Sequence, residues 1–215
     1  MFSLASRRLY LCVGLREDLS AFVRDVVAGG VDVVQLREKV APLSAQRGPA
    51  HALARLCRDL GVPFIVNDSP ELAAEVGADG VHVGQDDVTV AHCRELLGPA
   101  AIVGLSTHAE AELEPGLATS ATYLSAGPVV ATPTKLGRPG TGVGYALVAQ
   151  RRSDRPVFVT GGVSAATVGA LVERGLGHFV VVRALTEAAD PGAAARALRR
   201  ALDEALSAVP VEPAQ

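Results

Sequence analysis

The sequence has few aromatic residues: it contains no Trp, three Tyr and five Phe, about 4% of its 215 residues. Because 49% of the residues are nonetheless hydrophobic, the core must consist mainly of Val, Leu, Ile and Ala. Such a core favours parallel strands that are buried on both faces. A chain of this length can form one large α/β domain with a sizeable core.

Cysteine, net charge and long apolar runs are also limited. The scattered Cys12, Cys57 and Cys93 form no CxxC pair, which argues against a disulfide framework or a zinc site and favours reduced thiols. A net charge of -3 argues against a broad nucleic-acid-binding surface. No apolar run approaches the roughly 20 residues that span a bilayer. We therefore expect a soluble, cytoplasmic protein with neither nucleic-acid nor membrane partners.

The sequence does contain a regular alternation of apolar runs and helical patterns. Predicted strands lie at 9–13, 63–66, 101–105, 123–126 and 157–160, and within 29–35, 77–83 and 175–182, where helix-ending glycines precede them. The run at 9–15 follows two arginines but lacks a signal-peptide cleavage site, so we interpret it as a strand. Predicted helices cover 19–28, 50–60, 164–173 and 193–206.

Eight such strands predict a closed (β/α)8 barrel, or TIM barrel. We expect a single domain over residues 1–215, with a frayed tail at 209–215. An open doubly wound sheet gives the same alternation and is the alternative fold.

Charged residues follow the second predicted strand, where a purely structural strand would have little reason to carry them. In a barrel, functional side chains project from the carboxyl ends of the strands. Gln35, Arg37 and Lys39 alternate along one extended segment and therefore share a face. Their guanidinium and ammonium groups can bind phosphate oxygens. A solvated charge run at an exposed strand end is the alternative.

Two carboxylates, Asp68 and Asp87, follow the third and fourth strands. Carboxylates repel a phosphate unless a cation lies between them, and Mg²⁺ binds one or two carboxylates together with phosphate oxygens and water. Together with Arg37 and Lys39, they predict a metal-bridged polyphosphate site. Asp is also a favoured N-cap, and we expect Asp86 or Asp87 to cap the following helix.

The seventh strand leads into a glycine turn at Gly161 and Gly162, followed by a helix that Ser164 can cap. These glycines allow the backbone to approach an anionic ligand closely. Phosphate sites in barrels often follow the seventh and eighth strands. This position favours a phosphate site formed by the turn and by the end of the eighth strand, at Val182 and Arg183.

The segment 127–144 is the longest stretch without apolar periodicity, and we expect a mobile loop over the barrel mouth. Its Thr132, Thr134 and Lys135 suit a phosphate that arrives with loop closure. A Gly/Pro surface loop with an incidental lysine is the alternative.

Nucleophilic catalysis has little support in the sequence. Ser106 ends the fifth strand but has no evident His and Asp partners. His82 lies between two apolar strand residues, and we interpret it as a packed, hydrogen-bonded histidine outside the catalytic set. The five histidines show no metal-ligand spacing.

The motifs, taken in order, resemble those of the thiamine-phosphate synthase family, also called thiamine-phosphate pyrophosphorylases. The matching runs are QLREK at 35–39, ND at 67–68, HVGQDD at 82–87, GLSTH at 104–108, TPTK at 132–135 and TGGV at 160–163. No single run is decisive, but their order and spacing over almost the whole chain are specific.

The resemblance implies a (β/α)8 transferase of thiamine biosynthesis with Mg²⁺ as its cofactor. Its substrates would be 4-amino-2-methyl-5-(diphosphooxymethyl)pyrimidine and 4-methyl-5-(2-phosphooxyethyl)thiazole, the pyrimidine diphosphate and the thiazole phosphate below. In that family pyrophosphate leaves first, and the thiazole nitrogen captures the resulting pyrimidine carbocation. Such a reaction needs leaving-group stabilisation more than a strong base. Members commonly form dimers, so a homodimer is the expected assembly.

The resemblance also implies residue roles. The residues implied to hold the pyrimidine diphosphate are Gln35, Arg37, Lys39, Asn67 and Lys135, with Ser106 near both pyrimidine and diphosphate. The implied Mg²⁺ ligands are Asp68 and Asp87. The residues implied to bind the thiazole phosphate are Thr132, Thr134 and Gly162, and we add Val182 and Arg183 to the substrate-binding set. The expected catalytic residues are Arg37, Lys39, Ser106 and Lys135.

Two positions depart from the pattern of many relatives. Arg183 replaces a small serine after the eighth strand, and it either contacts the thiazole phosphate or points outward into an ion pair. Asp86 replaces a glutamate. Two alternative functions remain: a thiazole tautomerase of the related TenI type, which needs neither the pyrimidine diphosphate nor a metal, and a non-catalytic phosphate-binding barrel. Arg37, Lys39, Asp68 and Asp87 together argue against both.

Overall fold

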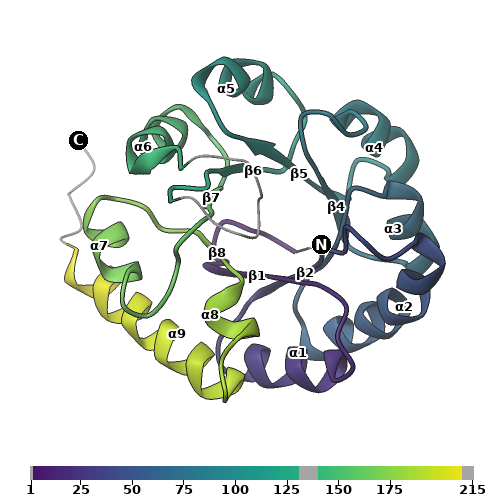
Figure 1. Ribbon diagram of the computed structural model, residues 1–215. Coiled ribbons are helices and arrows are strands. Elements are labelled where there is room, and N and C mark those ends of the chain that lie inside the picture. Colours follow the sequence, from purple (N-terminus) through teal and green to yellow (C-terminus); the bar gives the residue numbers. More distant parts are fainter. Residues whose placement is uncertain (1, 131–139, 210–215) are drawn as a thin grey trace.

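Eight parallel strands form a closed barrel in the computed structural model, which describes residues 2–130 and 140–209 (Figure 1). Neighbouring strands pair in chain order, and β1 pairs with β8 to close the ring. The strands are β1 Leu9–Val13, β2 Val33–Leu36, β3 Phe64–Asn67, β4 Gly80–Val83, β5 Ile102–Thr107, β6 Tyr123–Ala126, β7 Val157–Val159 and β8 Phe179–Val181. The predicted (β/α)8 barrel is confirmed, and the doubly wound alternative is wrong.

Helices alternate with the strands and surround the barrel (Figure 1). They are α1 Leu19–Ala28, α2 Leu43–Leu60, α3 Pro70–Val76, α4 Val90–Leu97, α5 Glu110–Leu117, α6 Gly142–Arg152, α7 Val168–Glu173, α8 Arg183–Thr186 and α9 Pro191–Ala208. Within residues 2–130 and 140–209, none of these helices is both long and apolar enough to cross a membrane.

Several helix boundaries differ from the predicted ones. Helix α2 begins at Leu43 and contains Pro49, which the prediction had placed before the helix. Ser164 does not cap α7, because its N–H donates to Thr167 Oγ1 at 3.0 Å in a turn that precedes the helix. Helix α6 begins at Gly142, inside the segment expected to be a loop. Residues 131–139 of that segment and 210–215 of the expected tail lie outside the described residues.

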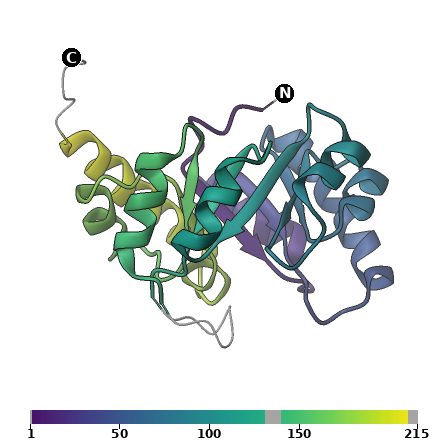
Figure 2. The same ribbon diagram turned by 90° about the horizontal axis from the view of Figure 1, so that it is seen from above.

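Side chains alternate between the two faces of each strand, and this separates the buried apolar residues into two clusters. The larger one lies between the outer face of the strands and the helices, and the smaller one fills the barrel interior. The interior cluster consists of Leu4, Tyr10, Val33, Ile65, Ile102, Tyr123, Phe158 and Val180. Leu4, from the N-terminal segment at one end of the barrel (Figure 2), is 3% exposed.

Towards the carboxyl ends of the strands, the barrel interior becomes polar. On β2, β3 and β6 the residue two positions beyond an interior apolar residue is polar, and it points inward because side chains alternate with period two. These residues are Gln35 after Val33, Asn67 after Ile65 and Ser125 after Tyr123. The barrel interior therefore has an apolar layer and, nearer the carboxyl ends of the strands, a polar chamber.

Two interior glycines allow this narrow packing. A Cβ on Gly80 would lie 1.8 Å from the carbonyl oxygen of Ile102 on the neighbouring strand. A Cβ on Gly104 would lie 2.1 Å from Tyr123 Cζ and 2.4 Å from His82 Nδ1. Real Cβ atoms do not approach other atoms so closely, so both positions require glycine.

Replacement of Gly80 by alanine should destabilise the protein by about 3 kcal/mol, at the upper end of the usual cost of overpacking, because backbone must move. The matched control is Gly169→Ala in α7, where a Cβ meets nothing within 4 Å. This change should stabilise the helix by about 0.5–1 kcal/mol. Urea unfolding followed by circular dichroism measures both. Equal stabilities of Gly80→Ala and the native protein would contradict the packing argument.

Candidate active site

A cavity of about 610 Å³ lies at the carboxyl ends of the strands. Every described residue of the predicted site lines it, and so does Asp86. These residues are Gln35, Arg37, Lys39, Asn67, Asp68, Asp87, Ser106, Gly162, Val182 and Arg183. Thr132, Thr134 and Lys135 lie outside the described residues. Residues far apart in the sequence thus converge on one space, as the alternation of strands and helices predicts.

Glu38 fixes the segment that carries the two basic residues. Its Oε1 accepts hydrogen bonds from the backbone N–H groups of Val40 at 2.8 Å and Ala41 at 3.2 Å, and Oε2 accepts from Leu15 at 3.2 Å. These backbone hydrogen bonds lower the pKa of the Glu38 carboxyl. Glu38 braces the loop after β2, while Arg37 and Lys39 on either side of it line the cavity. No role for Glu38 is predicted from the sequence.

The backbone is strained where β3 ends. Asp68 has a φ of 63° and is the only non-glycine residue with positive φ within 2–130 and 140–209. Its N–H donates to the carbonyl of His82 at 2.8 Å, and Ser69 N–H donates to the carbonyl of Asn67 at 2.9 Å, so Asp68 sits at the tip of a tight turn. Such a conformation costs about 1–3 kcal/mol and is found most often at functional sites.

The Asp68 carboxylate lies between a cation and a second carboxylate. It contacts the Lys39 ammonium and lies close enough to Asp87 for their charges to interact. Burial raises the pKa of the Asp68 carboxyl. Lys39 opposes this rise, and the negative charge of Asp87 adds to it. Asp87 Oδ2 is itself fixed by the Gly84 N–H at 2.7 Å. Negative charge therefore accumulates at the tops of β3 and β4.

The donor set at this point suits Mg²⁺. A divalent cation would offset the repulsion between the Asp68 and Asp87 carboxylates. Both carboxylates face the same cavity as Arg37 and Lys39. The described part of the chain holds no group of three or more His, Cys, Asp or Glu side chains arranged for a metal. Mg²⁺ commonly binds one or two carboxylates and takes its other ligands from phosphate oxygens and water.

The expectation that Asp86 or Asp87 caps the helix after β4 is wrong. Helix α4 begins at Val90, and its N-cap is Thr89, whose Oγ1 accepts from the His92 N–H at 3.1 Å. Without a capping role, both aspartates remain in the loop that lines the cavity.

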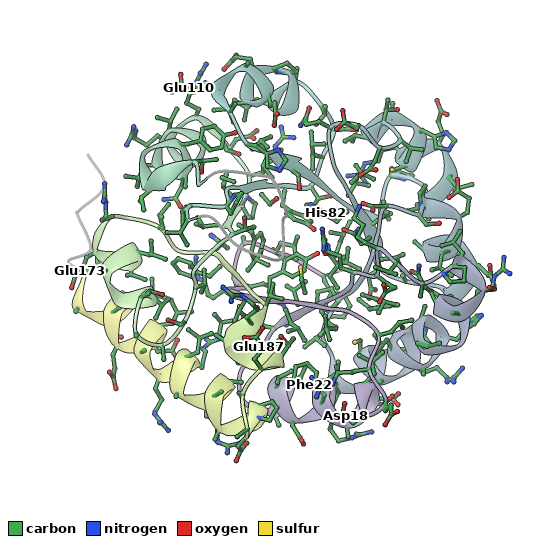
Figure 3. The ribbon with its side chains drawn as sticks, in the orientation of Figure 1. Asp18, Phe22, His82, Glu110, Glu173 and Glu187 are labelled. Atoms are coloured by element: carbon green, nitrogen blue, oxygen red, sulfur yellow. The ribbon has the colours of Figure 1, made fainter. Side chains whose placement is uncertain are left out.

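The floor of the cavity contains polar residues that the sequence analysis missed. His82 is buried, as expected, and both ring nitrogens are hydrogen-bonded, Nδ1 to the Tyr123 hydroxyl and Nε2 to Ser106 Oγ, each at 2.9 Å. It nevertheless lines the cavity and points into the barrel (Figure 3). The other unpredicted lining residues with polar side chains are Tyr10, Cys12, Gln85, His108, Tyr123, Ser125, Thr160 and Ser164. Inward alternation was the available signal for those that lie on strands, namely Tyr10, Cys12, Tyr123 and Ser125.

The opposite wall contains the glycine turn and the start of α8. Gly161 and Gly162 have φ values of 93° and 72°, and a Cβ on either would lie within 3 Å of Pro128 or Val130. Arg183 lines the cavity. Among the described residues it enters no ion pair.

Curated proteins similar to this chain include thiamine-phosphate synthases. One from Gloeobacter violaceus is 43% identical over 189 residues, covering 88% of this chain and 55% of that protein, so the chain spans little more than half of it. One from Mycobacterium bovis is 41% identical over 216 residues, covering 94% of this chain and 97% of that protein. The solved structure of thiamine phosphate pyrophosphorylase from Pyrococcus furiosus matches with a TM-score of 0.83 at 27% identity, covering 93% of this chain and 96% of that one.

The family model described as thiamine monophosphate synthase matches residues 9–185, from β1 to α8. This match covers all eight strands and every described residue of the predicted site. The chain therefore belongs to the thiamine monophosphate synthase family, whose members are transferases.

Proposed function

We propose that this chain couples the pyrimidine diphosphate with the thiazole phosphate, giving thiamine phosphate and pyrophosphate in an Mg²⁺-dependent reaction. The observation that carries the proposal is the convergence, in one cavity, of a carboxylate pair with a cluster of cations. A divalent cation and a diphosphate together neutralise this arrangement. Neither carboxylate would favour a phosphate ligand without the cation.

The leaving diphosphate would lie between β2 and β4. Arg37 would bind its oxygens in a bidentate manner, and Lys39 would supply a point charge. Asn67 Nδ2 is buried and has no hydrogen-bond partner among the described residues, so it offers a donor to an oxygen in this region. When bound between Asp68 and Asp87, Mg²⁺ would supply Lewis-acid stabilisation of the charge that accumulates on the diphosphate.

The coupling step would break the bond between the pyrimidine methylene carbon and the diphosphate oxygen, and the electron pair would leave with pyrophosphate. The thiazole nitrogen would then donate its lone pair to the methylene carbon. Gln35 and Ser106, on the cavity floor, would orient the pyrimidine for this attack, and Ser106 would also face the leaving diphosphate. Exclusion of water protects the carbocation, and we assign this task to the segment with Thr132, Thr134 and Lys135.

The acceptor phosphate would bind at the opposite wall. Gly162 allows the backbone close to an anion, and Val182 and Arg183 flank the same space. Because Arg183 has no ion-pair partner among the described residues, we propose that its guanidinium binds the thiazole phosphate. A tautomerase or a passive phosphate binder would have no use for the Lys39, Asp68 and Asp87 cluster.

Coupling of the two purified substrates, followed as pyrophosphate release, should require Mg²⁺ and stop in excess chelator. The Asp87→Asn variant should lose about 100-fold or more of kcat, because one metal ligand and its charge are weakened. The matched control is Asp86→Asn, whose carboxylate lies in the same loop, and we expect its kcat to change by less than about 3-fold.

Full activity in chelator would refute the metal assignment. Thiazole isomerisation without coupling would support the tautomerase, and ligand binding without turnover would support the non-catalytic barrel.

Replacement of Arg183 by serine should raise KM for the thiazole phosphate about 10-fold and leave KM for the pyrimidine diphosphate unchanged, because a charge-assisted hydrogen bond to one substrate is lost. Steady-state kinetics with each substrate varied in turn measures the two constants. Arg174→Ser, which removes one exposed positive charge at the end of α7, is the control. A thiazole-phosphate KM that stays at the native value in Arg183→Ser would contradict the assignment.

A further inference from the structure

A continuous chain of side-chain hydrogen bonds crosses the barrel interior. It begins at Gln35, whose Nε2 donates to the Tyr10 hydroxyl at 2.8 Å, and the hydroxyls of Tyr10 and Tyr123 are 2.8 Å apart. Tyr123 is 2.9 Å from His82 Nδ1, and His82 Nε2 is 2.9 Å from Ser106 Oγ. The chain thus connects strands β2, β1, β6, β4 and β5 and joins two residues at the proposed pyrimidine site.

The direction of this chain is set at Gln35. Its Oε1 accepts a hydrogen bond from the Cys12 thiol at 3.0 Å, which turns the amide N–H₂ towards Tyr10. The Tyr10 oxygen accepts from that amide, and the arrangement that gives every buried hydroxyl proton of this network an acceptor directs the Tyr10 proton to the Tyr123 oxygen. The Tyr123 proton then goes to His82 Nδ1.

The direction of these hydrogen bonds determines the tautomer of His82 and the position of the Ser106 hydroxyl proton. His82 Nδ1 accepts, so in the neutral ring the proton is on Nε2, which donates to Ser106 Oγ. Ser106 Oγ then has its own proton to donate, either to Ser125 Oγ at 3.2 Å or to a bound ligand. Burial raises the pKa of both Tyr10 and Tyr123, so both tyrosines keep the protons that the chain needs.

Residues of the barrel interior pack closely around this chain of hydrogen bonds. Gly104 lies beside both Tyr123 and His82, and a Cβ there would come within 2.3 Å of the Tyr123 hydroxyl and 2.4 Å of His82 Nδ1. Phe158 packs edge-on against the rings of Tyr10 and Tyr123, with centroid distances of 5.2 and 5.4 Å. Both hydroxyls are therefore held in place by packing as well as by hydrogen bonds.

We propose that this directed chain presets Ser106 as a hydrogen-bond donor towards the departing diphosphate, and that Tyr10, Tyr123 and His82 are positioning residues for the coupling reaction. The inference rests on the proposed function for the contact between Ser106 and the substrate. A donor stabilises negative charge that grows on the leaving group, whereas an acceptor would repel it. The direction of hydrogen bonds deep in the barrel thereby contributes to the rate.

The direction can be measured on the unliganded full-length protein by ¹⁵N NMR of the histidine rings. His82 of the native protein should show an unprotonated Nδ1 and a protonated Nε2. Tyr123→Phe removes the donor to Nδ1, and Tyr10→Phe disconnects Tyr123 from Gln35, where the direction is set. In both variants the Nδ1-protonated tautomer should appear. The control is Tyr145→Phe, where an equally conservative change lies outside the chain.

The same variants should differ in kinetics. In Tyr10→Phe and Tyr123→Phe, kcat for coupling should fall about 5- to 10-fold, as expected for loss of one oriented hydrogen bond, with KM for the pyrimidine diphosphate changing by less than about 2-fold. Tyr145→Phe should match the native kcat. Circular dichroism verifies that each variant is folded, and Tyr10→Phe remains a test if Tyr123→Phe does not fold.

A native His82 with its proton on Nδ1 would overturn the proposal, because Nδ1 would then donate to Tyr123 and Nε2 would accept from Ser106. Native tautomer and native kcat in both tyrosine variants would overturn it as well. Failure of the proposed function is separable from these results: it appears as absent coupling by the native protein, while the NMR measurement still reports the direction of the chain.

Discussion

The narrow interior of the closed barrel is the constraint on which the structure depends. Closure directs every second side chain of eight strands into a space that admits few large residues. Gly80 and Gly104 provide room for the side chains that cross it. The apolar residues occupy the end near the N-terminal segment, and the polar ones occupy the carboxyl ends of the strands. The chamber for chemistry is thus a direct result of which interior positions are apolar.

Stability and function compete at the tops of β3 and β4. Asp68 combines a backbone conformation that disfavours a non-glycine residue with a carboxylate that is partly buried beside Asp87. The backbone strain and the repulsion between the two carboxylates each oppose folding. Hydrogen bonds brace the loops around this site, through Glu38 after β2 and through the Gly84 N–H that donates to Asp87 after β4. The surrounding hydrogen bonds hold in place a site that would otherwise relax.

The sequence predicted the barrel well because period-two apolar runs and helix-ending glycines are local signals. It also located the charged residues at strand ends, since a charge after a buried strand is conspicuous. Helix starts were less accurate at Leu43 and Val168, where proline and a side-chain turn alter the first residues. The role of His82 could not be seen, because its partners Tyr123 and Ser106 come from other strands. Hydrogen bonds across the barrel leave no local pattern.

Pairing of β1 with β8 also has a consequence for how the chain folds. Leu9 lies beside Phe179, and Phe179 N–H donates to the carbonyl of Arg8 at 2.8 Å, so the ring closes between segments about 170 residues apart. Asp32 reinforces this junction, since it accepts from the N–H groups of Arg8 and Leu9 and pairs with Arg199. Contacts of such high sequence separation slow folding, because loop-closure entropy is lost before they form. During synthesis, β1 has an unpaired edge until the last strand emerges, and only then does the cavity acquire its final wall.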